Sequence, residues 1–165
     1  MKPVLFSVSY AGFWGQAELD LKAFVAHAGK LGYPAVEIMA KRPHLSVLDY
    51  GPDDIHDLAA HCRTCGVDVA CVAGYTNFSG GAESGEVPFI EMQVAYTRAL
   101  AQFAQALGCG LVRVFTSYER DDVPLAENWS RTVKAIRECC DVAAGSGVTI
   151  GIQNHHDVGV HSKAL

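Results

Sequence analysis

Polar side chains able to do chemistry follow the last apolar run of the chain, where residues 151–160 read GIQNHHDVGV. This run ends in Gln153 and Asn154, followed by His155, His156 and Asp157. Imidazole titrates near neutrality, so either histidine could transfer protons as a general base. A carboxamide has no useful pKa and offers only a neutral oxygen. The segment is therefore either the rim of an active site or a polar loop.

Two charged residues interrupt earlier apolar runs. Glu37 lies within AVEIM, and Arg113 lies within LVRVFT. Charged side chains are rare inside buried parallel strands unless they have a partner. We therefore predict that Glu37 and Arg113 face the same interior layer and interact. The alternative is that each lies at a strand end and faces water.

Further candidates lie in segments that follow apolar runs. His44 could reach over the mouth of a sheet to contact a substrate, or it could be an ordinary loop residue. Lys41 and Arg42 could hold an anionic group, or they could simply be solvated. Tyr75 and Trp14 could form an apolar wall for a ligand, with loop packing as the alternative.

Regular elements must position these residues, and the hydrophobic pattern predicts them. Five apolar runs of strand length begin at Val4, Ala35, Val67, Leu111 and Val148. Between them, apolar residues recur at steps of three and four, which predicts amphipathic helices around 21–31, 55–62, 92–107 and 129–143. A glycine follows each predicted helix, as expected where a helix ends in a left-handed residue. These are Gly32, Gly66, Gly108 and Gly147.

Alternation of strands and helices predicts parallel strands joined by right-handed crossovers. Segments 40–52, 74–86 and 117–126 all follow strands, so they should gather at one end of the sheet. In α/β folds that end carries the chemistry.

A barrel fits this pattern better than an open doubly wound sheet, because the chain has no glycine-rich phosphate loop. We predict an α/β fold, a partial (β/α)8 TIM barrel of five parallel strands and four helices, with residues 1–165 as one incomplete domain. A full barrel needs about 250 residues, so we expect an N-terminal fragment. Its free sheet edges and apolar inner face could drive association into a homo-oligomer.

Composition restricts the partners. The net charge of −5, with both signs mixed along the chain, disfavours nucleic acid as a partner. No apolar run has the length of a membrane span, and the N-terminus does not resemble a signal peptide, so we expect a cytoplasmic protein with no membrane partner. The six cysteines lie in or beside predicted helices and strands, which favours reduced, buried thiols over a disulfide framework or a zinc site.

Four segments, taken in order, carry a family resemblance: YPAVEIMAKRPH, AGYTNF, LVRVFTSYE and VTIGIQNHHD. They resemble the first five strand ends of the sugar phosphate isomerase/epimerase family of xylose isomerase-like TIM barrels. The resemblance implies a sugar substrate, a divalent metal ion (Mn²⁺, Mg²⁺, Co²⁺ or Zn²⁺) at the barrel mouth, and an enediolate reaction.

The fifth strand of such barrels ends in Glu-Asn-His, with the glutamate on the metal. Here Gln153 occupies that position, and the ligands from strands six to eight are absent, so the metal site of this chain is incomplete. The resemblance implies Gln153 as a metal ligand and His155 and Glu37 as catalytic residues. The expected substrate-binding residues are His44, Arg113, Asn154, Tyr75 and Trp14.

The leading functional hypothesis is a metal-dependent sugar or sugar-phosphate isomerase or epimerase, with the fragment alone expected to be inactive. A non-catalytic carbohydrate-binding barrel is the alternative, because Gln153 cannot act as a base. An AP endonuclease-type hydrolase is less favoured, since no histidine follows the third or fourth predicted strand and the chain is acidic.

Overall fold

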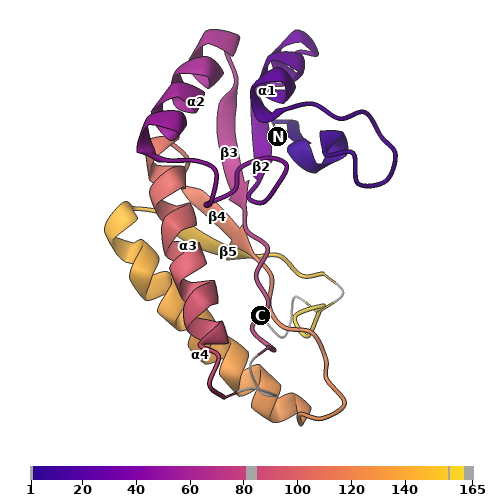
Figure 1. The fold of residues 1–165 in the computed structure, drawn as a ribbon, viewed down its shortest axis with the longest axis vertical. Coiled ribbons are helices and arrows are strands. Elements are labelled where there is room, and N and C mark those ends of the chain that lie inside the picture. Colours follow the sequence, from indigo (N-terminus) through magenta and orange to yellow (C-terminus); the bar gives the residue numbers. More distant parts are fainter. Residues whose placement is uncertain (1, 81–84, 156, 162–165) are drawn as a thin grey trace.

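Five parallel strands form one sheet in the order β1-β2-β3-β4-β5, as seen in a computed structural model that describes residues 2–80, 85–155 and 157–161 (Figure 1). The strands are β1 Val4–Phe6, β2 Ala35–Met39, β3 Asp68–Ala73, β4 Leu111–Val114 and β5 Thr149–Ile152. The helices are α1 Leu21–Lys30, α2 Pro52–Cys65, α3 Phe89–Ala106 and α4 Leu125–Ala143, with short 3-10 helices η1 Ser7–Tyr10 and η2 Ala144–Ser146. Each strand pairs with its neighbours in sequence, which confirms the partial barrel predicted from the sequence.

The boundaries of α2 show how local sequence sets an element. Pro52 occupies the first turn, and the Asp54 carboxylate accepts a hydrogen bond of 2.8 Å from the Gly51 amide. At the other end Gly66 adopts a left-handed conformation with φ 66°, and its amide donates to the carbonyls of Arg63 and Cys62. The predicted glycine stop is confirmed at this position.

The hydrophobic core lies between the helices and the outer face of the sheet. Val36 and Ile38 of β2 are fully buried there, together with Phe24 of α1, Leu58 of α2 and Leu100 of α3. Successive side chains of a strand point to opposite faces. Residues between the buried positions therefore point to the inner face of the sheet, and Glu37 is one of them.

The first strand is shorter than its apolar run, VLFSVSY, predicts. It ends at Phe6, and Ser7 begins the 3-10 helix η1. Ser7 is fully buried, and its hydroxyl accepts a hydrogen bond of 2.8 Å from the Met39 amide of β2. The side-chain oxygen takes the place of a backbone acceptor, so the two segments stay joined after the strand has ended.

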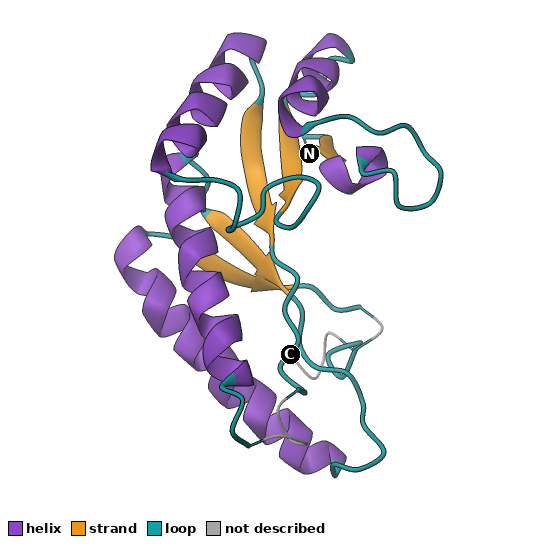
Figure 2. Cartoon of the chain, viewed as in Figure 1, coloured by secondary structure: helices purple, strands orange, loops and turns teal. Residues whose placement is uncertain are grey.

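The long segments that follow the strands lie together at one end of the sheet, and the helices α2, α3 and α4 succeed one another along the other side (Figure 2). Side chains hold these segments in place. The Thr76 hydroxyl donates to the Phe115 carbonyl at 2.8 Å and accepts from the Phe115 amide at 3.0 Å, which continues the β3–β4 pairing beyond the strands. Buried Asp157 accepts from the Thr116 amide at 2.8 Å and fixes the segment after β5.

All six cysteines are free thiols, and the predicted burial holds for four of them. Cys62, Cys71, Cys109 and Cys139 are buried, Cys65 is partly buried and Cys140 is exposed. Burial raises the pKa of Cys62 to about 11, so this thiol is a poor nucleophile and a poor metal ligand at neutral pH. Within the described ranges, no helix is long and apolar enough to cross a membrane.

Candidate functional site

An ion pair lies on the inner face of the sheet, as predicted. Arg113 of β4 and Glu37 of β2 approach within 3.3 Å, between Nη2 and Oε1. The guanidinium also donates through Nη1 to the Gly74 carbonyl at 3.0 Å. Arg113 is only 8% exposed, and its Nε has no hydrogen-bond partner in the part of the chain that the structure describes. Because this atom is itself buried, a ligand in the opening would meet other atoms of the guanidinium first.

Aromatic rings surround the Arg113 guanidinium. Its central carbon Cζ lies 4.5 Å from the ring centroid of Phe115, 5.3 Å from that of Tyr75 and 5.6 Å from that of Phe6. Cation–π contacts of this kind stabilise the guanidinium, which is planar and rigid and therefore packs well against aromatic rings. The rings therefore fix the guanidinium and form an apolar surface beside it.

Two adjoining cavities open around this pair and share Phe6, Arg113 and Gln153. The inner cavity has a volume of about 450 Å³ and is also lined by Glu37 and Asn154. The outer cavity has a volume of about 410 Å³. Its further lining includes Phe13, Trp14, Lys41, Tyr75 and His155. Glu37, Arg113 and Gln153 thus converge on one opening.

The segment after β5 reaches this opening through regular pairing. The Gln153 amide donates to the Val114 carbonyl at 3.0 Å, so β5 continues beside β4 and the Gln153 side chain faces both cavities. The ring of His155 lies 5.1 Å from that of Phe115. The side-chain nitrogen Nδ2 of Asn154 donates to the Val160 carbonyl at 3.3 Å. His156 lies outside the described residues.

His44 does not reach the opening, and the expectation that it contacts substrate is not supported. It is 1% exposed, and its ring stacks on Phe24 of the core. Its Nε2 donates to the Leu19 carbonyl at 3.0 Å, and its Nδ1 lies 3.0 Å from the Ser7 hydroxyl. With both nitrogens bonded, the ring ties the β2–α2 segment to the start of α1. Burial lowers the pKa of His44, which favours the neutral form.

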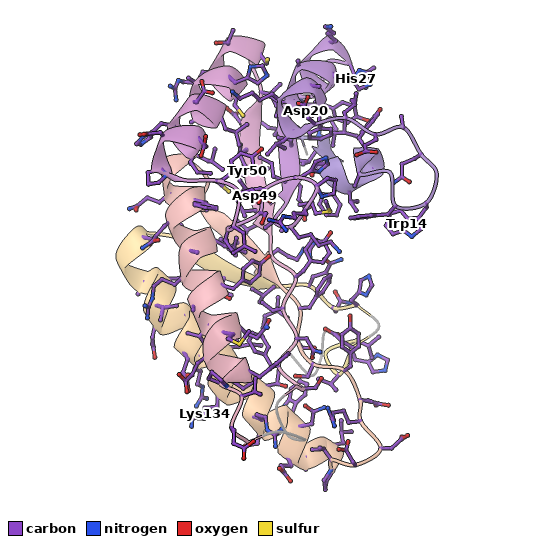
Figure 3. All side chains as sticks on the ribbon, viewed as in Figure 1. Trp14, Asp20, His27, Asp49, Tyr50 and Lys134 are labelled. Atoms are coloured by element: carbon purple, nitrogen blue, oxygen red, sulfur yellow. The ribbon has the colours of Figure 1, made fainter. Side chains whose placement is uncertain are left out.

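Other predicted residues lie at the outer cavity. Tyr75 is half-buried, and its amide donates to the Tyr96 hydroxyl at 3.4 Å. That hydroxyl also donates to the Ala40 carbonyl, so Tyr96 connects the ends of β2 and β3. Trp14 is 76% exposed in the segment between η1 and α1, on the side opposite Lys134 of α4 (Figure 3). Its indole is available as a wall for a ligand.

Among the lining residues, sequence reasoning missed Phe6 and Phe115, and it left Lys41 open between an anion contact and a solvated cation. The signal was present in the alternation of the strands. Phe115 lies two residues beyond Arg113 and continues the inward-facing set of β4. Lys41 lies beyond the end of β2, where strand alternation no longer decides its direction. Arg42 points elsewhere and binds Asp49, with 2.6 Å between Nε and Oδ2.

These side chains do not form a complete metal site. No group of three or more His, Cys, Asp or Glu residues is placed to hold an ion among residues 2–80, 85–155 and 157–161. Glu37, the carboxylate that lines the inner cavity, is bound to Arg113, and the positive charge of Arg113 repels a second cation. Gln153 offers one neutral oxygen.

Comparisons with solved structures identify the same architecture. D-Psicose 3-epimerase from Clostridium cellulolyticum H10 superposes with a TM-score of 0.71 and 22% identity, over 91% of this chain and 51% of that one. The probable 3-DHS dehydratase AsbF from Bacillus anthracis gives 0.71 and 16%, over 95% and 53%. The IOLI protein with a bound zinc atom gives 0.69 and 19%, over 92% and 51%. At such identities the likeness shows the fold.

This chain spans about half the length of the solved structures that it matches. No curated protein sequence matches it. Residues 25–163, most of the chain, match the family described as xylose isomerase-like TIM barrel. The protein belongs to the xylose isomerase-like TIM barrel family, and its five strands correspond to the first part of that barrel.

Proposed function

We propose that the chain supplies the sugar-binding part of a sugar isomerase or epimerase. The observation that carries this proposal is the convergence of Glu37, Arg113 and Gln153 on one opening lined by aromatic rings. Rings offer flat apolar surface to the C–H face of a sugar, and a few placed polar groups orient its hydroxyls. Arg113 lines both cavities, so its guanidinium is placed to donate to a sugar oxygen.

The proposed reaction is proton transfer next to a carbonyl. His155 removes a proton from the carbon beside the carbonyl of a ketose, and the electron pair moves to the carbonyl oxygen to give an enediolate. The guanidinium of Arg113 stabilises the negative charge that develops on that oxygen. A proton delivered from water to the opposite face of the enediolate gives the epimer. For the isomer, protonated His155 gives its proton to the former carbonyl carbon, the oxygen on that carbon takes up a proton from water, and the neighbouring hydroxyl loses its proton to become the new carbonyl.

A positioning role for Glu37 follows from its contacts. Its carboxylate holds Arg113, so its negative charge is already engaged. We therefore assign Glu37 to orienting the guanidinium rather than to removing a substrate proton. A divalent metal ion, when bound, would polarise the carbonyl. Gln153 is its only proposed ligand in this chain, and the steps above are assigned to side chains alone.

The test is exchange of the carbon-bound proton of D-psicose and D-fructose into deuterated water, followed by NMR. We expect exchange in the presence of the complete enzyme that contains this chain, and a loss of at least about 100-fold with His155→Gln, because general-base catalysis contributes that much. His56→Gln, exposed on α2, is the matched control and should leave exchange unchanged. Binding of both sugars without any exchange would contradict the proposal.

The second candidate is a non-catalytic carbohydrate-binding barrel. One observation favours it: Gln153 occupies the position at the end of β5 and cannot accept a substrate proton. Gln153→Glu distinguishes the two candidates. If the parent protein shows no proton exchange and Gln153→Glu does, the natural protein binds carbohydrate without catalysis.

A further inference from the structure

Lys41 holds an unusual position at the outer cavity. Its ammonium lies 4.1 Å from the ring centroid of Tyr75 and 5.0 Å from that of Phe13. Arg113 contacts the same Tyr75 ring, with its Cζ 5.3 Å from the centroid. Two cations therefore share one aromatic ring at the mouth of the site.

The charges of these two cations are balanced differently. Arg113 is paired with Glu37, whereas the lining of the outer cavity contains no Asp or Glu within the described ranges. No described carboxylate forms an ion pair with Lys41. Burial against the rings lowers the pKa of Lys41, and no neighbouring carboxylate offsets that effect. The cavity thus carries one uncompensated positive charge in a chain of net charge −5.

We propose that Lys41 is a specificity-determining residue that binds an acidic group, carboxylate or phosphate, of the sugar. The inference rests on the proposed function for the sugar itself. The rings of Tyr75 and Phe13 hold the ammonium in place and contribute no neutralising charge, so an anion entering the cavity completes the pair. The Arg113 guanidinium and the rings around it then contact the uncharged part of the same molecule.

The test compares three sugars with one skeleton by calorimetry: D-fructose, D-fructuronate and D-fructose 6-phosphate. We expect Kd for at least one acidic sugar to lie roughly tenfold or more below that for D-fructose, in line with a charge-assisted contact. Lys41→Met should remove this preference, and Lys41→Arg should retain most of it. The ratio between the two acids distinguishes carboxylate from phosphate as the preferred group.

Arg42→Met is the matched control, because it removes the neighbouring positive charge, which is bound to Asp49 outside the cavity. It should leave all three values of Kd unchanged. Equal binding of the neutral and acidic sugars, or an acid preference that survives in Lys41→Met, overturns the inference and leaves the proposed function standing.

If none of the sugars binds, the proposed function fails, and inorganic phosphate still tests the anion site. Broadening of its phosphorus NMR signal by the protein, lost in Lys41→Met, would support the inference. Absence of broadening, or broadening that persists in Lys41→Met, would overturn it.

Discussion

At the scale of single residues, the Arg113 guanidinium holds together the strands that form the inner face of the sheet. Arg113 bonds to Glu37 and to the Gly74 carbonyl and is covered by three rings, so it joins β2, β3 and β4 on the inner face. A cation held by these contacts orients both the neighbouring side chains and a bound ligand. Its removal should therefore affect both stability and binding.

Arg113→Met should lower the free energy of unfolding by about 2 kcal/mol. This is less than for a fully buried pair, because the Glu37 side chain is 26% exposed and water can reach its carboxylate. Urea denaturation provides the measurement. Arg131→Met, which breaks an i,i+4 pair with Glu127 on α4, should cost only about 0.5 kcal/mol. Equal losses of unfolding free energy in the two variants would show that the Arg113 contacts stabilise the fold no more than an exposed ion pair does.

The buried His44 predicts a dependence of stability on pH. Its pKa in the folded protein lies below the ordinary value of 6.5, because burial disfavours the charged ring. As the pH falls from 7 through 6.5 and below, the unfolded chain therefore takes up a proton before the folded protein does. Stability should drop over this range until the folded ring also protonates.

Urea unfolding of the parent protein and of His44→Gln between about pH 7 and pH 5 measures this contribution. Groups common to both proteins cancel in the difference. The variant should lose less stability on acidification, whatever its stability at pH 7. Parallel pH profiles for the two proteins would contradict the assignment, and His56→Gln, altered on an exposed face, provides the matched comparison.

At the scale of elements, the close approach of β3 and β4 positions the site. Gly74 follows β3, and its amide donates to the Arg113 carbonyl at 2.7 Å. A Cβ atom there would lie 2.9 Å from that carbonyl oxygen and 3.0 Å from Leu100 Cδ1. A side chain at this position would therefore push against the Arg113 backbone on one side and the packed Leu100 side chain on the other, so Arg113 would have to move.

Gly74→Ala should therefore destabilise the protein by about 1–3 kcal/mol, the usual range for overpacking. Gly110→Ala is the matched control, because nothing lies within 4 Å of a Cβ at that position. Thermal unfolding of the two variants compares them directly. A Gly74→Ala protein as stable as Gly110→Ala would mean that the two strands separate easily.

Elements were predictable from the sequence where a short-range pattern decides them. Helical periodicity and glycine stops are such patterns, and so is the need of Glu37 for a buried partner. The Glu37–Arg113 pair was the exception among long-range contacts, because two charges inside apolar strands each need a partner. Other long-range contacts were not predictable. His44 is drawn into the core by Ser7, which lies 37 residues away, and Lys41 is flanked by rings from two distant segments. No local pattern encodes such meetings.

At the scale of the whole molecule, the sheet ends in two open edges. β1 and β5 each pair with one strand only, within the described ranges. Ile152 of β5 is 37% exposed, and Val4 of β1 is 41% exposed. Unpaired edges beside exposed apolar side chains favour pairing with another chain.

We therefore predict that residues 1–165, produced alone, self-associate increasingly with concentration, as measured by sedimentation velocity. Ile152→Lys should weaken it roughly tenfold, because a charge on an edge strand opposes pairing. Leu125→Lys changes an equally apolar residue, 58% exposed at the start of α4 and away from the edges, and should have no effect. A protein that stays monomeric at every concentration would show that these edges are protected.

The central claim is that Glu37, Arg113 and Gln153 line one sugar-binding opening. Amide and side-chain chemical shifts, followed by heteronuclear NMR during titration with D-fructose, test it most directly. The account predicts saturable shifts at these three residues and at Tyr75 and His155, with none on the outer surfaces of α2 and α4. Shifts confined to the outer helices, or no shifts at any sugar concentration, would contradict it.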